Sequence, residues 1–253
     1  MISPPLISFS LFVLGALCAS FTGVIAERIH TGQSWVSGRS RCNSCRALLD
    51  FRDLLPIVSW FVHVGRCRVC RARIPAAYAI AELILGTAFV LAYHALGLVS
   101  ALPFFLVALV VLLFIVLYDL RHMVVPTNAS NVLIVLGLIV AFLRAPSVKE
   151  FGLVLATAGI IALFFFLMHV LSKGRAMGLG DAPIALALSL LVGIYAFAGL
   201  LFSFWIGALY GIAVLSTRRG GPRMGIEVPF VPFLALGYLL AFFSTWNPFV
   251  FVL

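Results

Sequence analysis

Negative charge is scarce in this chain: 253 residues contain eight Asp and Glu against 17 Lys and Arg. Charged residues make up 10% of the chain, whereas a soluble domain averages about 25%. The chain is 64% hydrophobic, with a mean hydropathy of +1.20, and its apolar residues form blocks of about 20, the length that crosses a bilayer. This pattern predicts an all-α polytopic membrane protein, and continuous apolar runs argue against the alternation of a β-barrel.

Several common catalytic signatures are also missing. The sequence has no G-x-S-x-G, no H-E-x-x-H and no dinucleotide-type G-x-G-x-x-G, so it does not indicate a serine hydrolase, a zincin or a Rossmann-type cofactor site. No internal repeat is evident, which disfavours a transporter built from duplicated halves. The first apolar run lacks a basic region before it and is long enough to span, so we expect a retained transmembrane helix rather than a signal peptide.

Eight spans are predicted from the apolar runs. They cover residues 6–26, 76–96, 101–118, 129–143, 151–171, 183–197, 199–215 and 229–244. The sixth and seventh are the least distinct, because residues 184–215 form one apolar stretch. Gly193 and Gly199 are predicted to mark the turn between them.

Basic residues predict the orientation, because Lys and Arg accumulate on the cytoplasmic side of bacterial membrane proteins. If residues 27–75 are cytoplasmic, alternation places segments 119–128, 172–182 and 216–228 there too. These four segments hold 15 of the 17 basic residues, and the opposite side holds only Arg144 and Lys149. The excess positive charge is therefore explained by topology, and no nucleic-acid partner is expected.

Four of the five cysteines fall into two C-x2-C pairs inside the longest polar segment, residues 27–75. The pairs are Cys42 with Cys45 and Cys67 with Cys70. This spacing is typical of a structural four-cysteine zinc site, which leaves no open position for catalysis. The alternative is a pair of disulfides or free thiols, and a reducing cytoplasm disfavours the disulfides.

Two acidic residues lie where apolar runs meet short polar loops. Asp119 ends the third predicted span, and Asp181 closes the sequence Gly178-Leu179-Gly180-Asp181. Carboxylates at membrane depth are costly and usually functional, and two of them close together share a proton and can activate water for peptide hydrolysis. The glycines would let a substrate strand approach the backbone. The plain alternative is a pair of solvated helix-end aspartates.

Two further readings stay open from the residues alone. Glu82 lies about one and a half turns inside the second span, where it is either functional or paired with a basic residue of the cysteine segment. The alternative function is a proton-coupled membrane carrier in which the two aspartates form the relay. Such a relay would need carboxylates on a path that joins both faces, whereas both aspartates are predicted on one face.

Several short motifs, spread over nearly the whole chain, together resemble those of one known protein family. They are Ser20-Phe21 through Arg28, Cys42-x2-Cys45, Ser59-Trp60, Gly65-Arg66-Cys67-Arg68-x-Cys70, Glu82, Asp119 with Pro126, Gly178-x-Gly180-Asp181 and residues 228–235. In combination they resemble the bacterial prepilin peptidases of type IV pilus and type II secretion systems, which are G-x-G-D aspartic intramembrane proteases.

This resemblance implies a bifunctional enzyme of the bacterial inner membrane. Asp119 and Asp181 would be the protease dyad that cleaves the leader of type IV prepilins or pseudopilins at the cytoplasmic face. The new N-terminus would then be methylated with S-adenosylmethionine. The resemblance implies structural zinc on the four cysteines, methyl-transfer roles for Glu82 and Gly65, and a substrate loop at Gly178 and Gly180.

The expected organisation has three parts. A first transmembrane helix covers residues 1–26, a cytoplasmic zinc-binding and methyltransferase-associated domain covers 27–75, and a seven-helix peptidase domain covers 76–253. The expected partners are the prepilin substrates and membrane lipid.

Overall fold

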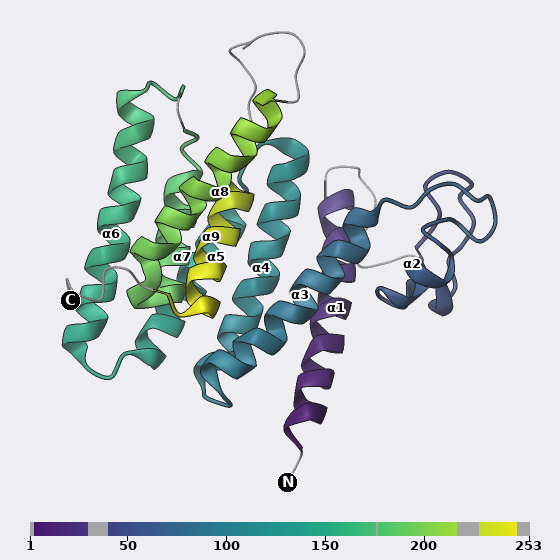
Figure 1. Ribbon diagram of the computed structural model, residues 1–253, viewed down its shortest axis with the longest axis horizontal. Helices are drawn as coiled ribbons and strands as arrows, with labels where there is room; N and C mark the ends of the chain where they lie inside the picture. The colour runs from purple at the N-terminus through teal and green to yellow at the C-terminus, as the bar shows by residue number, and fades with distance from the viewer. Residues whose placement is uncertain (1–2, 30–39, 176, 217–227, 247–253) are drawn as a thin grey trace. The chain divides into compact units, whose positions relative to one another are not determined.

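The computed structural model describes residues 3–29, 40–175, 177–216 and 228–246 (Figure 1). Over these ranges the regular structure is helical, with only two isolated β-bridges, Arg41 to Leu48 and Arg66 to Arg73. The predicted all-α membrane fold is confirmed. Residues 30–39 of the predicted cysteine segment and residues 217–227 of the last predicted basic loop lie outside the described residues.

The apolar helices follow the predicted spans. They are α1 (Pro4–Arg28), α3 (Ala76–Leu96), α4 (Ala101–His122), α5 (Thr127–Arg144), α6 (Val148–Leu171), α7 (Asp181–Val192), α8 (Ala196–Ser216) and α9 (Val231–Ser244). Between α1 and α3 lie η1 (Phe51–Leu54) and the short α2 (Val58–Val62). Within the described ranges, six helical segments are long and apolar enough to cross a bilayer, with residues 181–216 counted as one and α9 shorter than the rest.

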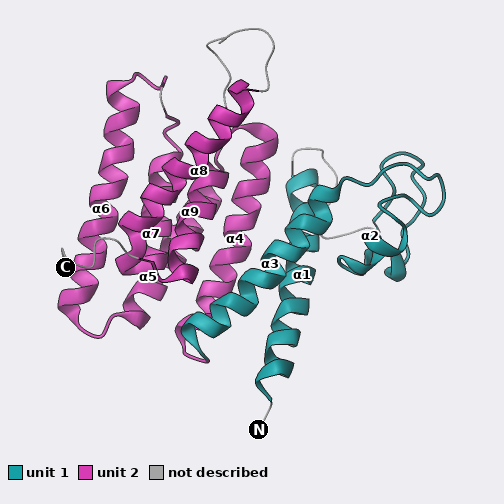
Figure 2. Ribbon diagram, in the orientation of Figure 1, with its two compact units in different colours: residues 1–97 teal, residues 98–253 magenta. Residues whose placement is uncertain are grey.

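The chain divides into two compact units, residues 1–97 and 98–253 (Figure 2). In the first unit α1 packs on α3 through small residues. A Cβ atom placed on Gly15 would lie 2.8 Å from the backbone oxygen of Leu85, and one placed on Gly86 would lie 2.9 Å from that of Phe12. Such close backbone approach is how helices associate in lipid, where the hydrophobic effect between them is absent.

In the second unit α7 is the most enclosed helix, with α5, α6 and α9 packed around it. All but two of its twelve residues are buried, Asp181 among them. Its C-terminal end is satisfied by Arg144 of α5, which donates a 3.0 Å hydrogen bond to the carbonyl of Leu191 and lies 5.0 Å from the Phe242 ring centroid. A cation here complements the negative end of the helix dipole.

The predicted turn between the sixth and seventh spans is only half right. Gly193 ends α7 with φ +62°, followed by the 3-10 turn η2 (Gly193–Tyr195). Gly199, in contrast, lies inside α8, where an added Cβ would come within 2.8 Å of the Tyr238 ring. Its glycine therefore serves the contact between α8 and α9 rather than a turn. From sequence, the two uses of glycine look the same.

Candidate active site and metal centre

Asp119 lies in the last turn of α4 and is 5% exposed. The helix ends just beyond it, because Met123 adopts the left-handed conformation. The backbone N–H of Met123 donates a hydrogen bond to the Asp119 carbonyl at 2.8 Å. The backbone N–H of Val231, in the first turn of α9, lies against the Asp119 carboxylate. The other carboxylate oxygen, Oδ2, is buried without a hydrogen-bond partner among the described residues. A buried acceptor of this kind needs a partner such as water or substrate.

Asp181 is the first residue of α7 and is 6% exposed. Its carboxylate Oδ2 accepts a hydrogen bond from the backbone N–H of Gly178 at 3.2 Å. The backbone N–H of Asp181 in turn donates a hydrogen bond to the Gly178 carbonyl at 3.3 Å. The loop before α7 is thus folded back onto the carboxylate, which fixes the side chain in the first helical turn.

The two carboxylates belong to helices separated by the two crossings of α5 and α6, yet the charge of Asp119 acts directly on Asp181. Both lie in the second unit, at the same end of its helices. Asp181 lies at the N-terminus of α7, and Asp119, in the last turn of α4, lies against the backbone N–H of Val231 in the first turn of α9. Helix N-termini stabilise negative charge, so the fold can hold a carboxylate here at a depth where water is scarce.

The loops next to the two aspartates pack closely against each other at Gly180. A Cβ atom on Gly180 would lie 2.7 Å from the Cβ of Val125, in the short connection between α4 and α5. At Gly178 the nearest atom to an added Cβ is the Asp181 carboxylate, at 3.6 Å, an ordinary contact. The two glycines of this loop therefore differ: one permits close packing of loops, and the other leaves room beside the carboxylate.

His169 is a residue near this site whose contact the sequence analysis did not foresee. Its Nδ1 lies 2.9 Å from the carbonyl oxygen of Met177, immediately before the glycine loop. It therefore ties the end of α6 to the segment that carries Asp181. Val231 was likewise not singled out, although the resemblance over residues 228–235 pointed to its segment. No periodicity reveals either contact, since both depend on the meeting of distant helices.

The four paired cysteines converge in the first unit. Their sulfur atoms all lie within 4.8 Å of one another, and Cys42 Sγ is 3.8 Å from Cys70 Sγ. In a tetrahedron with Zn–S bonds of about 2.3 Å, the sulfur atoms are about 3.8 Å apart. The thiols are free in the structure, with no disulfide among the described residues. Geometry and donor chemistry therefore fit one zinc ion held by four thiolates.

Each pair is carried by the same small hairpin. The N–H of Cys42 donates to the Ala47 carbonyl, and the N–H of Cys67 donates to that of Ala72, at 2.9 and 2.8 Å. Arg46 and Arg71 follow the second cysteine of each pair, and both adopt a left-handed φ near 60°, at 59° and 61°. The underlying repeat, R-C-x-x-C-R-A, recurs at a spacing of 25 residues. The sequence analysis reported no internal repeat, and this short one within the cysteine segment was missed.

The hairpins already favour a thiolate at one of the four positions. Hydrogen bonds from the backbone N–H groups of Cys45 and Ser44 lower the pKa of Cys42 to about 6. At Cys70 the backbone N–H of Ala72 acts in the same direction, but hydrogen bonds with the neighbouring thiols prevail and raise its pKa to about 11. Crowded thiols of this kind lose their protons together when a dication binds among them.

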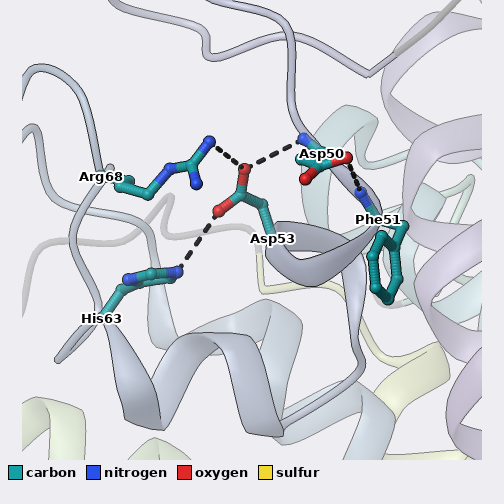
Figure 3. A network of polar contacts seen from close by, with 5 residues as sticks. All are labelled: Asp50, Phe51, Asp53, His63 and Arg68. Carbon is teal, nitrogen blue, oxygen red and sulfur yellow. Dashed lines mark hydrogen bonds and ion pairs between the residues drawn. The ribbon is translucent and has the colours of Figure 1, made fainter.

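A polar network joins the second hairpin to η1 (Figure 3). Asp53 Oδ1 lies 3.3 Å from His63 Nε2, and its Oδ2 lies 3.6 Å from Arg68 NH2, inside the second C-x2-C pair. The same Oδ2 accepts the backbone N–H of Asp50 at 3.0 Å. Asp53 therefore links three parts of the cysteine segment that are not adjacent in sequence, and such outer contacts orient metal ligands.

Glu82 and Gly65 both make structural contacts within the first unit. Glu82 is 8% exposed, and its Oε2 accepts the backbone N–H of Ile57 at 2.6 Å. Gly65 has φ +62°, and an added Cβ would lie 2.9 Å from the Trp60 ring. Trp60 in turn donates from Nε1 to the carbonyl of Ile74 at 3.2 Å. Pairing of Glu82 with a basic residue was one of two alternatives, and among the described residues no such pair is seen, since a backbone N–H takes that place.

Two family models match the chain. The model of the bacterial peptidase A24 N-terminal domain matches residues 13–96, and that of the type IV leader peptidase family matches residues 106–212. The first match covers all four paired cysteines, and the second covers both aspartates. No solved structure matches the chain.

Curated relatives resemble the chain over most of its length. A prepilin leader peptidase/N-methyltransferase of Bacillus subtilis (strain 168) is 31% identical over 234 residues, which are 92% of each chain. A protein of the same name from Myxococcus xanthus (strain DK1622) is 31% identical over 87% of this chain and 67% of its own length. A type 4 prepilin-like proteins leader peptide-processing enzyme of Escherichia coli O78:H11 (strain H10407 / ETEC) is 30% identical over 81% of this chain and 77% of its own.

Similarity of this extent, over both the cysteine segment and the helices that carry the aspartates, shows that the chain belongs to the prepilin leader peptidase/N-methyltransferase family.

Proposed function

We propose that this protein is a membrane-embedded aspartic endopeptidase that removes the leader peptide of type IV prepilins or pseudopilins, with Asp119 and Asp181 as its catalytic pair. The observation that carries the proposal is that two buried carboxylates from separate helices interact electrostatically. The names of the relatives supply the substrate class, since they are prepilin leader peptidases.

The chemistry follows from the pairing. Two buried carboxylates whose charges interact share one proton, because like charges in a poorly hydrated site repel. The ionised one takes a proton from a water molecule, and the protonated one hydrogen-bonds the carbonyl oxygen of the scissile peptide. Asp119 Oδ2 has an open acceptor position for that water. Asp181 is held in place by the N–H of Gly178.

We place the catalytic end at the cytoplasmic face. Asp119 precedes the α4–α5 connection, and α5 crosses to Arg144 at its other end. Arg144 and Lys149 are the two basic residues that the predicted topology puts on the opposite side, against 15 on the side of the aspartates. The positive-inside rule then orients the chain. The apolar stem of a prepilin would enter from the lipid, with the bond to be cut at the membrane boundary.

Cleavage of a purified prepilin tests the dyad. Asp119→Asn and Asp181→Asn keep the size of each side chain but remove its ability to carry the shared proton. Each single variant is expected to lose cleavage by a factor of at least ~10³, the usual effect of removing a catalytic acid or base. Membrane insertion, followed by fractionation, is expected to stay normal. Retained cleavage in either variant contradicts the dyad, and proton flux in proteoliposomes without proteolysis would favour the carrier instead.

Methyl transfer is the second activity that we propose, and it rests on the relatives' names. S-adenosylmethionine would supply the methyl group, and the zinc held by Cys42, Cys45, Cys67 and Cys70 would maintain the fold of the cysteine segment. The roles of Glu82 and Gly65 in methyl transfer remain predictions. Mass spectrometry of the processed pilin, with and without S-adenosylmethionine, measures the activity directly as one added methyl group on the new N-terminal residue.

A further inference from the structure

The stretch from Phe51 to Val64 is apolar but not buried. It runs through η1 and α2, and neither element has a buried residue. Phe61 is 67% exposed and Val62 is 69% exposed. The large side chains that are exposed along η1 and α2 are Phe51, Leu54, Leu55, Val58, Phe61 and Val62. We call these six residues the apolar ridge. A polar, metal-stabilised segment in water gains nothing from such a surface, and contiguous exposed apolar residues mark an interaction site.

The ridge is fixed at a definite height along α3. Ile57 lies between η1 and α2, at the middle of the ridge, and donates its N–H to Glu82 at 2.6 Å. Glu82 is six residues after the start of α3 at Ala76, which is about 9 Å along the helix axis. Figure 1 shows α2 on the side of the first unit where α1 ends and α3 begins. Because the 21 residues of α3 measure about 31 Å, the thickness of the hydrocarbon, Glu82 lies about 9 Å inside its boundary.

The backbone at Ile57 has an unfavourable conformation. Its φ is +63° and its ψ is −54°, a region that a β-branched residue rarely occupies. A buried carboxylate accepting a short hydrogen bond from that residue compensates for part of the cost. The chain thus bends at Ile57 to bring the ridge beside α3, which a loop projecting into water would not require.

Charge around the ridge favours a negatively charged partner. Residues 40–75 contain seven arginines and two aspartates, and all seven arginine side chains are exposed: Arg41, Arg46, Arg52, Arg66, Arg68, Arg71 and Arg73. Arg52 lies beside the ridge, with its guanidinium 5.8 Å from the ring centroid of Phe51. Aromatic and aliphatic side chains bordered by basic residues are the pattern of a surface that lies in the headgroup region of an anionic bilayer.

We infer that the apolar ridge is a membrane-interface anchor. Its side chains enter the acyl boundary of the leaflet that contains the ends of α1 and α3, and the surrounding arginines bind the phosphates of anionic phospholipid. Glu82 sets the depth through Ile57, so it acts as a positioning residue for the cysteine segment. The consequence is that the zinc-binding hairpins are held against the membrane surface rather than free in the cytoplasm. This inference is independent of the proposed peptidase chemistry.

A photo-crosslinking experiment identifies what covers the ridge. Benzoylphenylalanine replaces Phe61 in the full chain, which is reconstituted in vesicles of phosphatidylethanolamine and phosphatidylglycerol. The matched control carries it at Phe9 of α1, where the exposed fraction is 65% against 67% at Phe61. Irradiation is expected to yield phospholipid adducts at both positions, within about threefold of each other, as detected by mass spectrometry. Replacing phosphatidylglycerol by phosphatidylcholine is expected to lower the adduct at Phe61 but not at Phe9.

The Glu82→Ala variant tests whether the hydrogen bond from Ile57 to Glu82 positions the apolar ridge. In Glu82→Ala the Phe61 adduct is expected to fall at least about fivefold while the Phe9 adduct is unchanged, because only the first depends on the hydrogen bond to Ile57. Zinc content, measured in the same preparation, reports whether the hairpins still fold in Glu82→Ala. If they do not, the inference is tested only by the crosslinks of the chain that keeps Glu82. Crosslinks from Phe61 to residues 98–253 or to an added prepilin, in place of lipid, overturn the inference. So does the absence of any Phe61 adduct when Phe9 is labelled.

Discussion

Leu179 has a glycine on either side, and the two glycines have different surroundings. Gly180 is packed against Val125, and Gly178 faces the Asp181 carboxylate at an ordinary distance. Neither has a positive φ among the described glycines, so conformational freedom does not explain them. The G-x-G pattern therefore combines one glycine needed for close loop packing and one that leaves space next to the Asp181 carboxylate.

The first prediction compares Gly180→Ala with Gly178→Ala. In Gly180→Ala the new methyl group would overlap the Val125 side chain, push the two loops apart and reduce prepilin cleavage by about 10- to 100-fold, since catalytic geometry is sensitive to shifts near 1 Å. Gly178→Ala is expected to retain cleavage within a few-fold, because its backbone N–H to Asp181 is kept. Rates of leader removal measure both variants.

Rescue provides the control for this prediction. Val125→Gly removes the Cβ and both Cγ atoms that Gly180→Ala would strike, so the double variant is expected to recover much of the lost rate. Equal damage from the two glycine substitutions, or a double variant no better than Gly180→Ala, would refute the packing explanation.

At the scale of elements, glycine and other small residues determine which helices approach closely. The buried face of α1 consists of small residues, and all of them are Gly, Ala or Thr: Gly15, Ala16, Ala19, Thr22, Gly23 and Ala26. Their positions do not require the same degree of contact. Gly15 touches the backbone of α3, whereas an added Cβ at Gly23 would meet only the Tyr78 ring, at 3.6 Å.

The second prediction follows from this difference. Gly15→Ala is expected to lower the melting temperature of the purified protein, because its methyl group would collide with backbone atoms that cannot move separately from α3; overpacking of this kind costs about 1–3 kcal/mol. Gly23→Ala, on the same face of the same helix, is expected to be neutral or slightly stabilising. Thermal unfolding in detergent compares them, and equal stability of the two variants would contradict the packing of α1 on α3.

The third prediction concerns the end of α7. Arg144 satisfies the Leu191 carbonyl and lies over Phe242, so it joins α5, α7 and α9 on the side away from the aspartates. Arg144→Met keeps the length of the side chain but leaves that carbonyl without its donor, at an expected cost of about 1–3 kcal/mol. Lys149→Met is the matched control, because Lys149 is exposed at the start of α6. An unchanged melting temperature for Arg144→Met would show that the cap is dispensable.

At the scale of the whole molecule, the two predicted functions fall in different compact units. The four paired cysteines lie within residues 1–97, and both aspartates lie within residues 98–253. The hairpins have little core of their own, since Cys67 is the only buried large or medium apolar side chain among residues 40–75. Zinc bound by the four cysteines would therefore contribute a large share of their folding free energy.

The fourth prediction is that zinc removal separates the two activities. Chelation of the full chain is expected to unfold residues 40–75 and abolish methyl transfer, while leader cleavage by the aspartates is retained within a few-fold. Cys45→Ser is expected to do the same by removing one ligand, and Cys18→Ser, outside the cluster, is the control. Metal content, amide exchange of the cysteine segment and the two activities are measured together. Loss of cleavage in step with loss of zinc would show that the units are functionally coupled.

The sequence by itself determined the membrane class, the eight apolar helices, the four-cysteine site and the two aspartates as candidates. These follow from local quantities: run length, spacing of thiols and the cost of a carboxylate in an apolar segment. The same local patterns could not distinguish the turn at Gly193 from the packing glycine at Gly199. They also did not reveal His169, Val231 or the contact between Gly180 and Val125.

Only the tertiary structure decided which groups meet. The electrostatic interaction of Asp119 with Asp181, the N-terminus of α9 beside Asp119 and the hydrogen bond from Ile57 to Glu82 each join segments separated by 25 residues or more. Such contacts depend on how helices cross and pack. A helix in lipid has apolar residues on all its faces, so composition does not distinguish the face that packs on another helix from the face that meets lipid. Composition therefore indicated where costly polar groups lie, and the packing of the helices determined which partners stabilise them.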